Sequence, residues 1–250
     1  MRTTGIVSVT FRALSPDEII ELTKRAGLSG IEWGGDIHVP SGELHNARTV
    51  GERTRDAGLR VLSYGSYYRA GQATETFPEI LETAQALGAP HIRIWAGAKG
   101  SAQVSPEERE AISEDCRRVV KLAADAGVAV STEFHGGTLT DTPESALRLI
   151  EETGVQTYWQ PNQFRDQAYN ETALTAVLPH VTGVHVFHWV GDTWLPLGEG
   201  EAPWAAYRKI LSARPDAPMM MEFVPGHSPR RFVKDAATLL SWVKADADLL

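Results

Sequence analysis

The chain has 250 residues, of which 42% are hydrophobic and 22% are charged, and its formal net charge is −8. This composition is ordinary for a soluble globular protein, and no apolar run reaches the roughly 18 residues of a membrane span. The acidic balance argues against a nucleic-acid surface and against binding to anionic membranes. The N-terminus lacks the apolar core of a signal peptide, and a single cysteine, Cys116, precludes an internal disulfide. We therefore expect a cytoplasmic protein.

A strand–helix unit repeats along the chain. Predicted strands occupy residues 4–11, 30–36, 60–66, 91–97, 128–135, 155–160, 182–188 and 218–224, and a helix is expected after each. Helices commonly end in a left-handed glycine, and five glycines precede predicted strands: Gly27, Gly58, Gly88, Gly127 and Gly154. A hydroxyl that caps a helix, followed by proline, occurs four times: Ser15-Pro16, Ser105-Pro106, Thr142-Pro143 and Ser228-Pro229.

Eight such units without a linker or a low-complexity segment predict one α/β domain over residues 1–250, a (β/α)₈ TIM barrel. A doubly wound open sheet is the alternative fold. It would want a glycine-rich phosphate-binding loop after the first strand, and residues 8–18 contain no glycine.

Three residues indicate a metal site. Glu133 and Glu222 each stand inside an otherwise apolar strand, and His185 lies in a similar run. Carboxylates are almost never fully buried without a partner, and a cation would supply one. Two carboxylates, an imidazole and a further oxygen donor suit Mn²⁺ or Mg²⁺ best, and Co²⁺ or Zn²⁺ less specifically. The alternatives are a glutamate paired with Arg93 and a hydrogen-bonded core histidine.

Active sites of TIM barrels lie where the strands end, and polar and aromatic residues gather there in this sequence. The candidate substrate-binding residues at these positions are Trp33, His38, Tyr64, Arg93, Trp95, Asn162 and Gln163. Their aromatic members, together with Tyr67 and Trp159, form either a wall that stacks against a sugar or part of the core.

Three more residues are candidates for function. His135 shares the strand face of Glu133, whereas His188 faces away from His185 in an ideal strand, and either histidine could act as a catalytic acid. Arg230 opens the last helix, where backbone N–H groups favour a substrate anion. The alternative for Arg230 is an ordinary solvated arginine.

The chain resembles the sugar isomerase/epimerase superfamily with the xylose-isomerase-like barrel, which includes ketose 3-epimerases, hydroxypyruvate isomerase and inosose dehydratase, with endonuclease IV as a distant relative. The resemblance covers nearly the whole chain. The motifs that carry it are Gly30-Ile31-Glu32-Trp33, Thr132-Glu133-Phe134-His135, His185-Val186, Pro196-Leu197-Gly198-Glu199-Gly200-Glu201 and Met221-Glu222-Phe223.

The resemblance implies four metal ligands, of which Glu133, His185 and Glu222 match the family pattern. The sixth strand departs from the family pattern, because Gln160 is the residue nearest to the position of the family's usual aspartate. Gln160 would ligate the metal through its amide oxygen. Gln163 replaces a family histidine a few residues later. His188 stands where relatives often have an acidic residue.

The resemblance also implies a reaction. A metal-bound hydroxy-carbonyl substrate loses a proton to one of the two glutamates and regains it, through an enediolate, in an isomerisation or epimerisation of a small sugar. A dehydratase (lyase) on the same site is the first alternative, with His135 or His188 protonating the leaving hydroxyl. An abasic-site endonuclease and a non-catalytic sugar-binding barrel are the others. The sequence leaves the substrate and a homo-oligomeric state open.

Overall fold

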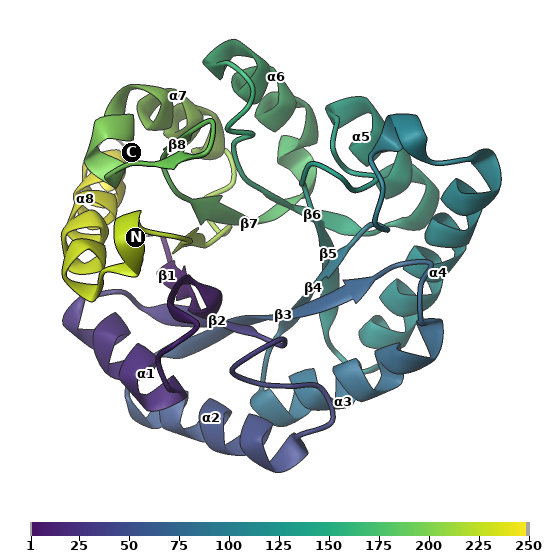
Figure 1. Ribbon diagram of the computed structural model, residues 1–250, viewed down its shortest axis with the longest axis horizontal. Helices are drawn as coiled ribbons and strands as arrows, with labels where there is room; N and C mark the ends of the chain where they lie inside the picture. Colours follow the sequence, from purple (N-terminus) through teal and green to yellow (C-terminus); the bar gives the residue numbers. More distant parts are fainter. Residues whose placement is uncertain (1, 249–250) are drawn as a thin grey trace.

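The computed structural model describes residues 2–248, and within them eight parallel strands close into a barrel surrounded by helices (Figure 1). In order around the barrel, the strands are β1 (Thr4–Val7), β2 (Gly30–Gly34), β3 (Arg60–Arg69), β4 (His91–Trp95), β5 (Ala129–Glu133), β6 (Gln156–Trp159), β7 (Val181–Val186) and β10 (Met219–Met221). The helices are α1 (Pro16–Arg25), α2 (Leu44–Asp56), α3 (Phe77–Leu87), α4 (Pro106–Asp125), α5 (Pro143–Thr153), α6 (Gln167–Val177), α7 (Glu201–Leu211) and α8 (Pro229–Ala247). The predicted TIM barrel is confirmed.

Local sequence signals explain where the helices begin and end. Ser15 and Ser105 form complete capping boxes at α1 and α4, and the hydroxyls of Thr142 and Ser228 cap α5 and α8. The five glycines predicted after helices all have a positive φ, between 73° and 78°. These turns depend on residues close in sequence, so the pattern alone could predict them.

All eight barrel strands differ in length from their prediction, seven being shorter and one longer, and two of these differences affect the barrel mouth. The first ends at Val7, and Ser8–Phe11 forms a 3₁₀-helix in which the Ser8 hydroxyl accepts the backbone N–H of Gly34. The third continues to Arg69, with a shift of register against β4 after Gly65. Strand length at the barrel mouth depends on whether a neighbouring strand still offers a ladder partner, which local propensity does not reveal.

Large side chains opposite glycines fill the lower barrel. A Cβ added to Gly5 or Gly30 would lie 2.5 or 2.6 Å from side-chain carbons of Leu62. A Cβ on Gly183 would lie 2.7 Å from the ring of Tyr158. Because these side chains occupy the interior, the polar residues one layer higher have a packed floor beneath them.

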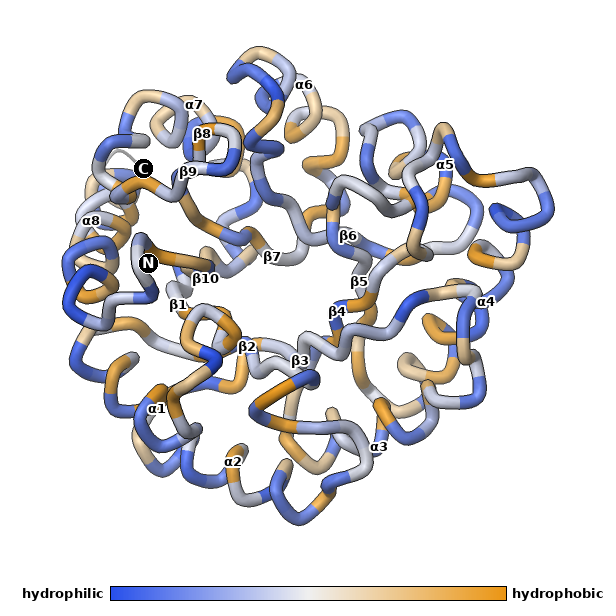
Figure 2. Tube along the Cα trace, viewed as in Figure 1, coloured by the Kyte–Doolittle hydropathy of each residue, from blue (hydrophilic) through white to orange (hydrophobic). Residues whose placement is uncertain are grey.

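Hydrophobic and hydrophilic residues alternate along the surrounding helices (Figure 2), as expected for helices with one face on a barrel. Between β7 and α7 the chain forms a small antiparallel hairpin, β8 (Trp189–Val190) and β9 (Thr193–Trp194). None of the helices described within residues 2–248 is long and apolar enough to cross a membrane.

Candidate metal centre and barrel mouth

Four potential metal ligands meet at the carboxyl end of the barrel. Glu133 ends β5, His185 lies near the end of β7, and Glu222 directly follows β10. One ligand atom from each of these three lies within 4.8 Å of the others, and all three residues are buried. Gln160, just after β6, places its Oε1 atom 3.3 Å from Nδ1 of His185. The structure therefore brings together all four residues that were predicted to bind a metal.

The donor set fits a divalent cation. Nδ1 of His185 lies 3.4 Å from an oxygen of Glu222 and 3.6 Å from an oxygen of Glu133, in addition to the amide oxygen of Gln160. One ring nitrogen carries at most one hydrogen, so it can satisfy only one of these three oxygens. A cation bound among them would satisfy all four groups. Three oxygens and one nitrogen suit Mn²⁺ or Mg²⁺.

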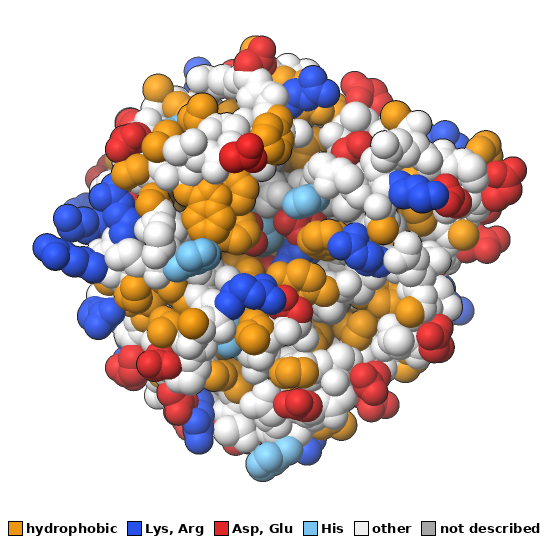
Figure 3. Space-filling model, viewed as in Figure 1, with side chains coloured by type: hydrophobic (Ala, Val, Ile, Leu, Met, Phe, Trp, Pro, Cys, Tyr) orange, Lys and Arg blue, Asp and Glu red, His pale blue; other side chains and the backbone are white. Residues whose placement is uncertain are grey.

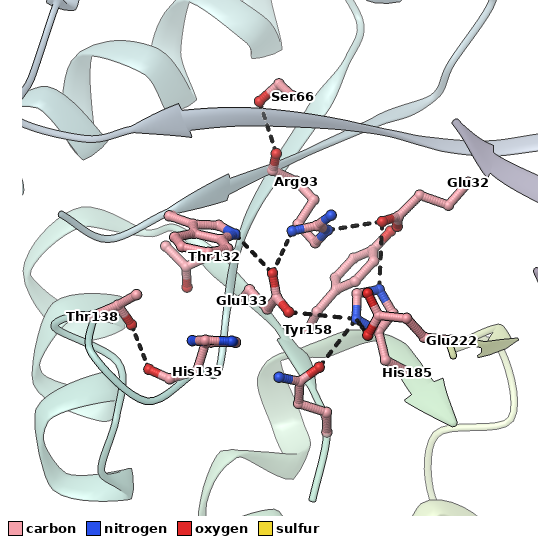
Figure 4. A network of polar contacts seen from close by, with 12 residues as sticks. Glu32, Ser66, Arg93, Thr132, Glu133, His135, Thr138, Tyr158, His185 and Glu222 are labelled. Atoms are coloured by element: carbon pink, nitrogen blue, oxygen red, sulfur yellow. Dashed lines mark hydrogen bonds and ion pairs between the residues drawn. The ribbon is translucent and has the colours of Figure 1, made fainter. Parts of the chain in front are cut away.

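A buried ion-pair network supports this cluster (Figure 4). Nε of Arg93 donates to Oε1 of Glu32 at 2.8 Å, and Nη1 of Arg93 donates to Oε2 of Glu133. The Ser63 hydroxyl donates to the other oxygen of Glu32 at 2.6 Å. Glu32 and Arg93 are 0% and 2% exposed, so the guanidinium group of Arg93 is buried between two carboxylates. Its expected role as a substrate-binding residue stays a prediction, and the pairing of Arg93 with a glutamate is confirmed.

Glu32 is the residue of this network that sequence reasoning left out. It stands inside the apolar strand β2, which is the signal that identified Glu133 and Glu222. Its Oε1 atom lies 3.5 Å from Nε2 of His185, and both side chains are fully buried. Histidines that bind metals usually direct their second nitrogen at a carboxylate, which keeps the proton on that nitrogen. With a cation bound among the ligands, Glu32 would therefore hold the remaining proton on Nε2 and leave the lone pair of Nδ1 for the ion.

The charges of the network act strongly on one another. Burial alone would raise the pKa of Glu133, but Arg93 and His185 outweigh it and hold that pKa well below its usual range. Burial raises the pKa of Glu222 to about 7, although the positive charge of His185 opposes the shift. Burial would lower the pKa of His185, but Glu222 and Glu32 raise it to about 10. Three ionised carboxylates outnumber the two positive charges of Arg93 and His185, and this excess of negative charge favours a bound cation.

Aromatic and cationic groups surround the mouth above the cluster, where Figure 3 shows a hollow with acidic and histidine side chains inside it. Nε1 of Trp95 donates to Glu133 at 2.9 Å, and the half-buried ring of His135 stacks on Trp95 at 5.0 Å. Tyr67 and Phe223 have φ values of 59°, which is unusual for aromatic residues. Such backbone conformations cluster at functional sites.

The hairpin β8–β9 contributes a second aromatic group, which sequence reasoning did not find. Trp189 and Trp194 stack at 5.0 Å with nearly parallel rings, and Phe223 contacts both of them. Their positions depend on the hairpin and on the backbone turn at Phe223. Neither feature follows from the strand pattern that guided the prediction.

The structure places three predicted mouth residues in the core instead. Trp33 is fully buried and donates from Nε1 to the hydroxyl of Thr54 on α2. Tyr64 is fully buried and donates from its hydroxyl to the carbonyl of Val39. His38 packs edge-on against Trp33. Side chains alternate along a strand, so Trp33 faces the helices while its neighbour in β2 faces the barrel interior. The core alternative is thus confirmed for Trp33 and Tyr64, and Trp159 also packs in the core.

Four other predicted residues lie outside the cluster. His188, Asn162 and Gln163 line a pocket of about 200 Å³ between the segment after β6 and the hairpin. The ring of His188 packs over Gly200, which agrees with its expected direction away from the metal ligands. Arg230 is exposed at the start of α8 and has no ion pair within residues 2–248. Substrate contacts of these residues stay predictions.

Comparison with known proteins agrees with the fold. The sequence profile of the xylose isomerase-like TIM barrel family matches residues 20–244. The chain belongs to this family. A 3-dehydroshikimate dehydratase of Bacillus anthracis is 27% identical over 161 residues, which are 59% of this chain and 56% of that protein. The matched region therefore spans just over half the length of that curated relative.

Solved structures show the same barrel at lower identity. The probable 3-dehydroshikimate dehydratase of petrobactin synthesis from Bacillus anthracis has a TM-score of 0.81 at 19% identity, covering 95% of this xylose isomerase-like chain and 98% of the other. The 3-keto-D-glucoside 4-epimerase of E. coli has a TM-score of 0.74 at 18% identity, covering 98% and 100%. A xylose isomerase-like barrel from Mycobacterium smegmatis, in complex with magnesium, has a TM-score of 0.71 at 15% identity, covering 98% of each chain. At these identities the likeness shows the fold alone.

Proposed function

We propose that this barrel is a divalent-metal-dependent enzyme that isomerises or epimerises a small polyhydroxylated carbonyl compound. One observation carries the proposal: the oxygens of Glu133, Gln160 and Glu222 converge on Nδ1 of His185 at the carboxyl end of the barrel. Barrel enzymes place their active sites at this end. Membership of the xylose isomerase-like family supports the proposal.

The residues divide the chemistry among them. A divalent ion held by these ligands supplies a Lewis acid for the substrate carbonyl and its neighbouring hydroxyl. Glu133 and Glu222 reach the site from β5 and from the end of β10, which β6 and β7 separate around the barrel. One carboxylate takes the proton from the carbon beside the carbonyl, and the C–H electron pair moves toward the carbonyl oxygen. Return of a proton to the opposite face of the same carbon gives the epimer. Return of a proton to the adjacent, former carbonyl carbon gives the isomer.

Dehydration is the second candidate, and two observations favour it. His135 stacks on Trp95, which donates a hydrogen bond to Glu133, so an imidazole lies near a potential general base. The Bacillus anthracis relative is a dehydratase. In this reaction a glutamate again removes the proton beside the carbonyl. The electron pair then forms a C=C bond, and His135 protonates the β-hydroxyl as it leaves as water.

Product analysis in D₂O separates the two reactions. Purified protein is stripped with EDTA, reloaded with Mn²⁺ and incubated with ketoses and with 3-dehydroshikimate, and the mixtures are read by NMR and mass spectrometry. An isomerase or epimerase incorporates solvent deuterium without loss of water, whereas a dehydratase yields a product lighter by one water molecule. Activity that survives complete removal of the metal would contradict both candidates.

A further inference from the structure

Arg69 forms part of a stack of planar groups beside the metal centre. Arg69 ends β3 and Trp95 ends β4, and the two residues are paired across the strands. The Cζ atom of Arg69 lies 4.0 Å from the centroid of the Trp95 ring, on which His135 also stacks. Because the indole N–H donates to Glu133, only one indole separates the guanidinium group from a proposed catalytic carboxylate.

Arg69 has no acidic partner among residues 2–248, unlike two other arginines of this region. Arg12 pairs with Asp36, and the buried arginine of β4 lies between two glutamates. Nη1 of Arg69 donates only to the carbonyl of Gly97, at 3.2 Å. Partial burial lowers the pKa of Arg69, and no carboxylate offsets this shift. A half-buried cation without a counterion is stabilised when an anion binds to it.

The guanidinium group is held ready for such an anion. Stacking on Trp95 fixes its plane, and the hydrogen bond to Gly97 fixes its position. A guanidinium carries five N–H donors in a planar fork, so most of the donors of Arg69 stay available. Two parallel N–H groups match the two oxygens of a carboxylate, and the single positive charge of Arg69 balances the single negative charge of one carboxylate.

We propose that the substrate is a hydroxy-carbonyl compound that also carries a carboxylate, and that Arg69 binds this carboxylate at the barrel mouth. The inference rests on the proposed function, because the carbonyl end of the same molecule must reach Glu133, His185 and Glu222. Because only the indole of Trp95 separates the guanidinium group of Arg69 from the carboxylate of Glu133, the substrate must be a compact molecule, such as a polyhydroxylated ring acid. Neutral sugars would leave Arg69 without a partner.

A pair of probes that differ mainly in charge tests the proposal by isothermal titration calorimetry. Quinate is a cyclic polyhydroxy carboxylate, and myo-inositol is an uncharged ring polyol. The Mn²⁺-loaded parent protein should bind quinate at least tenfold more tightly than myo-inositol. Arg69→Gln should weaken quinate binding about 10- to 100-fold and leave myo-inositol binding unchanged, because a charge-assisted hydrogen bond is lost. Arg69→Lys, which keeps the charge without the fork, should be intermediate.

Arg25→Gln is the matched control, since Arg25 is exposed at the end of α1 and forms no ion pair among residues 2–248, and it should leave both affinities unchanged. Equal binding of the two probes by the parent, undetectable quinate binding, or parent-like quinate binding by Arg69→Gln would each overturn the carboxylate site. Two other outcomes distinguish a failure of the carboxylate site from a failure of the proposed function. Turnover of neutral ketoses that is insensitive to Arg69→Gln retains the metal-dependent reaction and removes the carboxylate site. Arg69-dependent quinate binding without any turnover retains the site and removes the reaction.

Discussion

Glu32 should control metal affinity although it is not one of the four candidate ligands. Replacing it with glutamine removes one of three carboxylate charges and the group that faces Nε2 of His185 at 3.5 Å. Arg93 keeps its second partner, Glu133, so the fold should survive even though breaking a buried pair costs about 3–5 kcal/mol at most. Loss of an outer partner of a metal ligand typically weakens binding about 10- to 100-fold, or about 1.4–2.7 kcal/mol.

The assay is calorimetric titration of EDTA-stripped protein with Mn²⁺. We expect the dissociation constant of Glu32→Gln to rise within that 10- to 100-fold range, with a smaller rise for Ser63→Ala, which removes one hydrogen bond but keeps the carboxylate charge. Circular dichroism verifies that both variants fold. A folded Glu32→Gln protein that binds Mn²⁺ as tightly as the parent would refute the assignment, because neither the charge nor the orientation of His185 would then matter.

Further predictions concern the reaction, pH and packing. Glu133→Gln and Glu222→Gln should each lower kcat about 10²–10⁴-fold and slow deuterium exchange into the substrate; a Glu133→Gln enzyme that binds metal and keeps the parent rate would exclude Glu133 as the base. Burial lowers the pKa of His91 to about 4. Between pH 6.5 and 4, His91 is therefore protonated in the unfolded chain but not in the folded chain. The free energy of unfolding should decrease as the pH is lowered through this range, by at most about 3 kcal/mol. Urea titrations across this range should show a shallower fall for His91→Gln, and an equal fall would contradict the assignment. Gly183→Ala should destabilise the barrel by about 1–3 kcal/mol, because the added Cβ would lie 2.7 Å from the ring of Tyr158. Gly136→Ala is the control and should not destabilise the barrel, because open space surrounds its Cβ. Equal melting temperatures for the two variants would count against this packing.

The repeated unit and three candidate metal ligands could be predicted from local chemistry. The serine caps and left-handed glycines act within a few residues, so the sequence marks where helices begin and end. A charged or imidazole side chain inside an apolar strand needs a partner, which singled out Glu133, His185 and Glu222. The same signal is present at Glu32, whose partner, Arg93, lies 61 positions further along the chain.

Only the tertiary structure decided which side chains reach the mouth. Strand alternation sends Trp33 and Tyr64 into the core, and its phase depends on register shifts between β2, β3 and β4. The stack of Arg69 on Trp95 likewise follows from pairing beyond a register shift, and the aromatic group at Phe223 requires a positive φ and a distant hairpin. The sequence by itself determined the barrel and the chemical types of its candidate metal ligands, because these depend on local pattern and on the cost of burying charge. The direction of each mouth residue depends on ladder pairing between segments far apart in the chain, which only the closed barrel fixes.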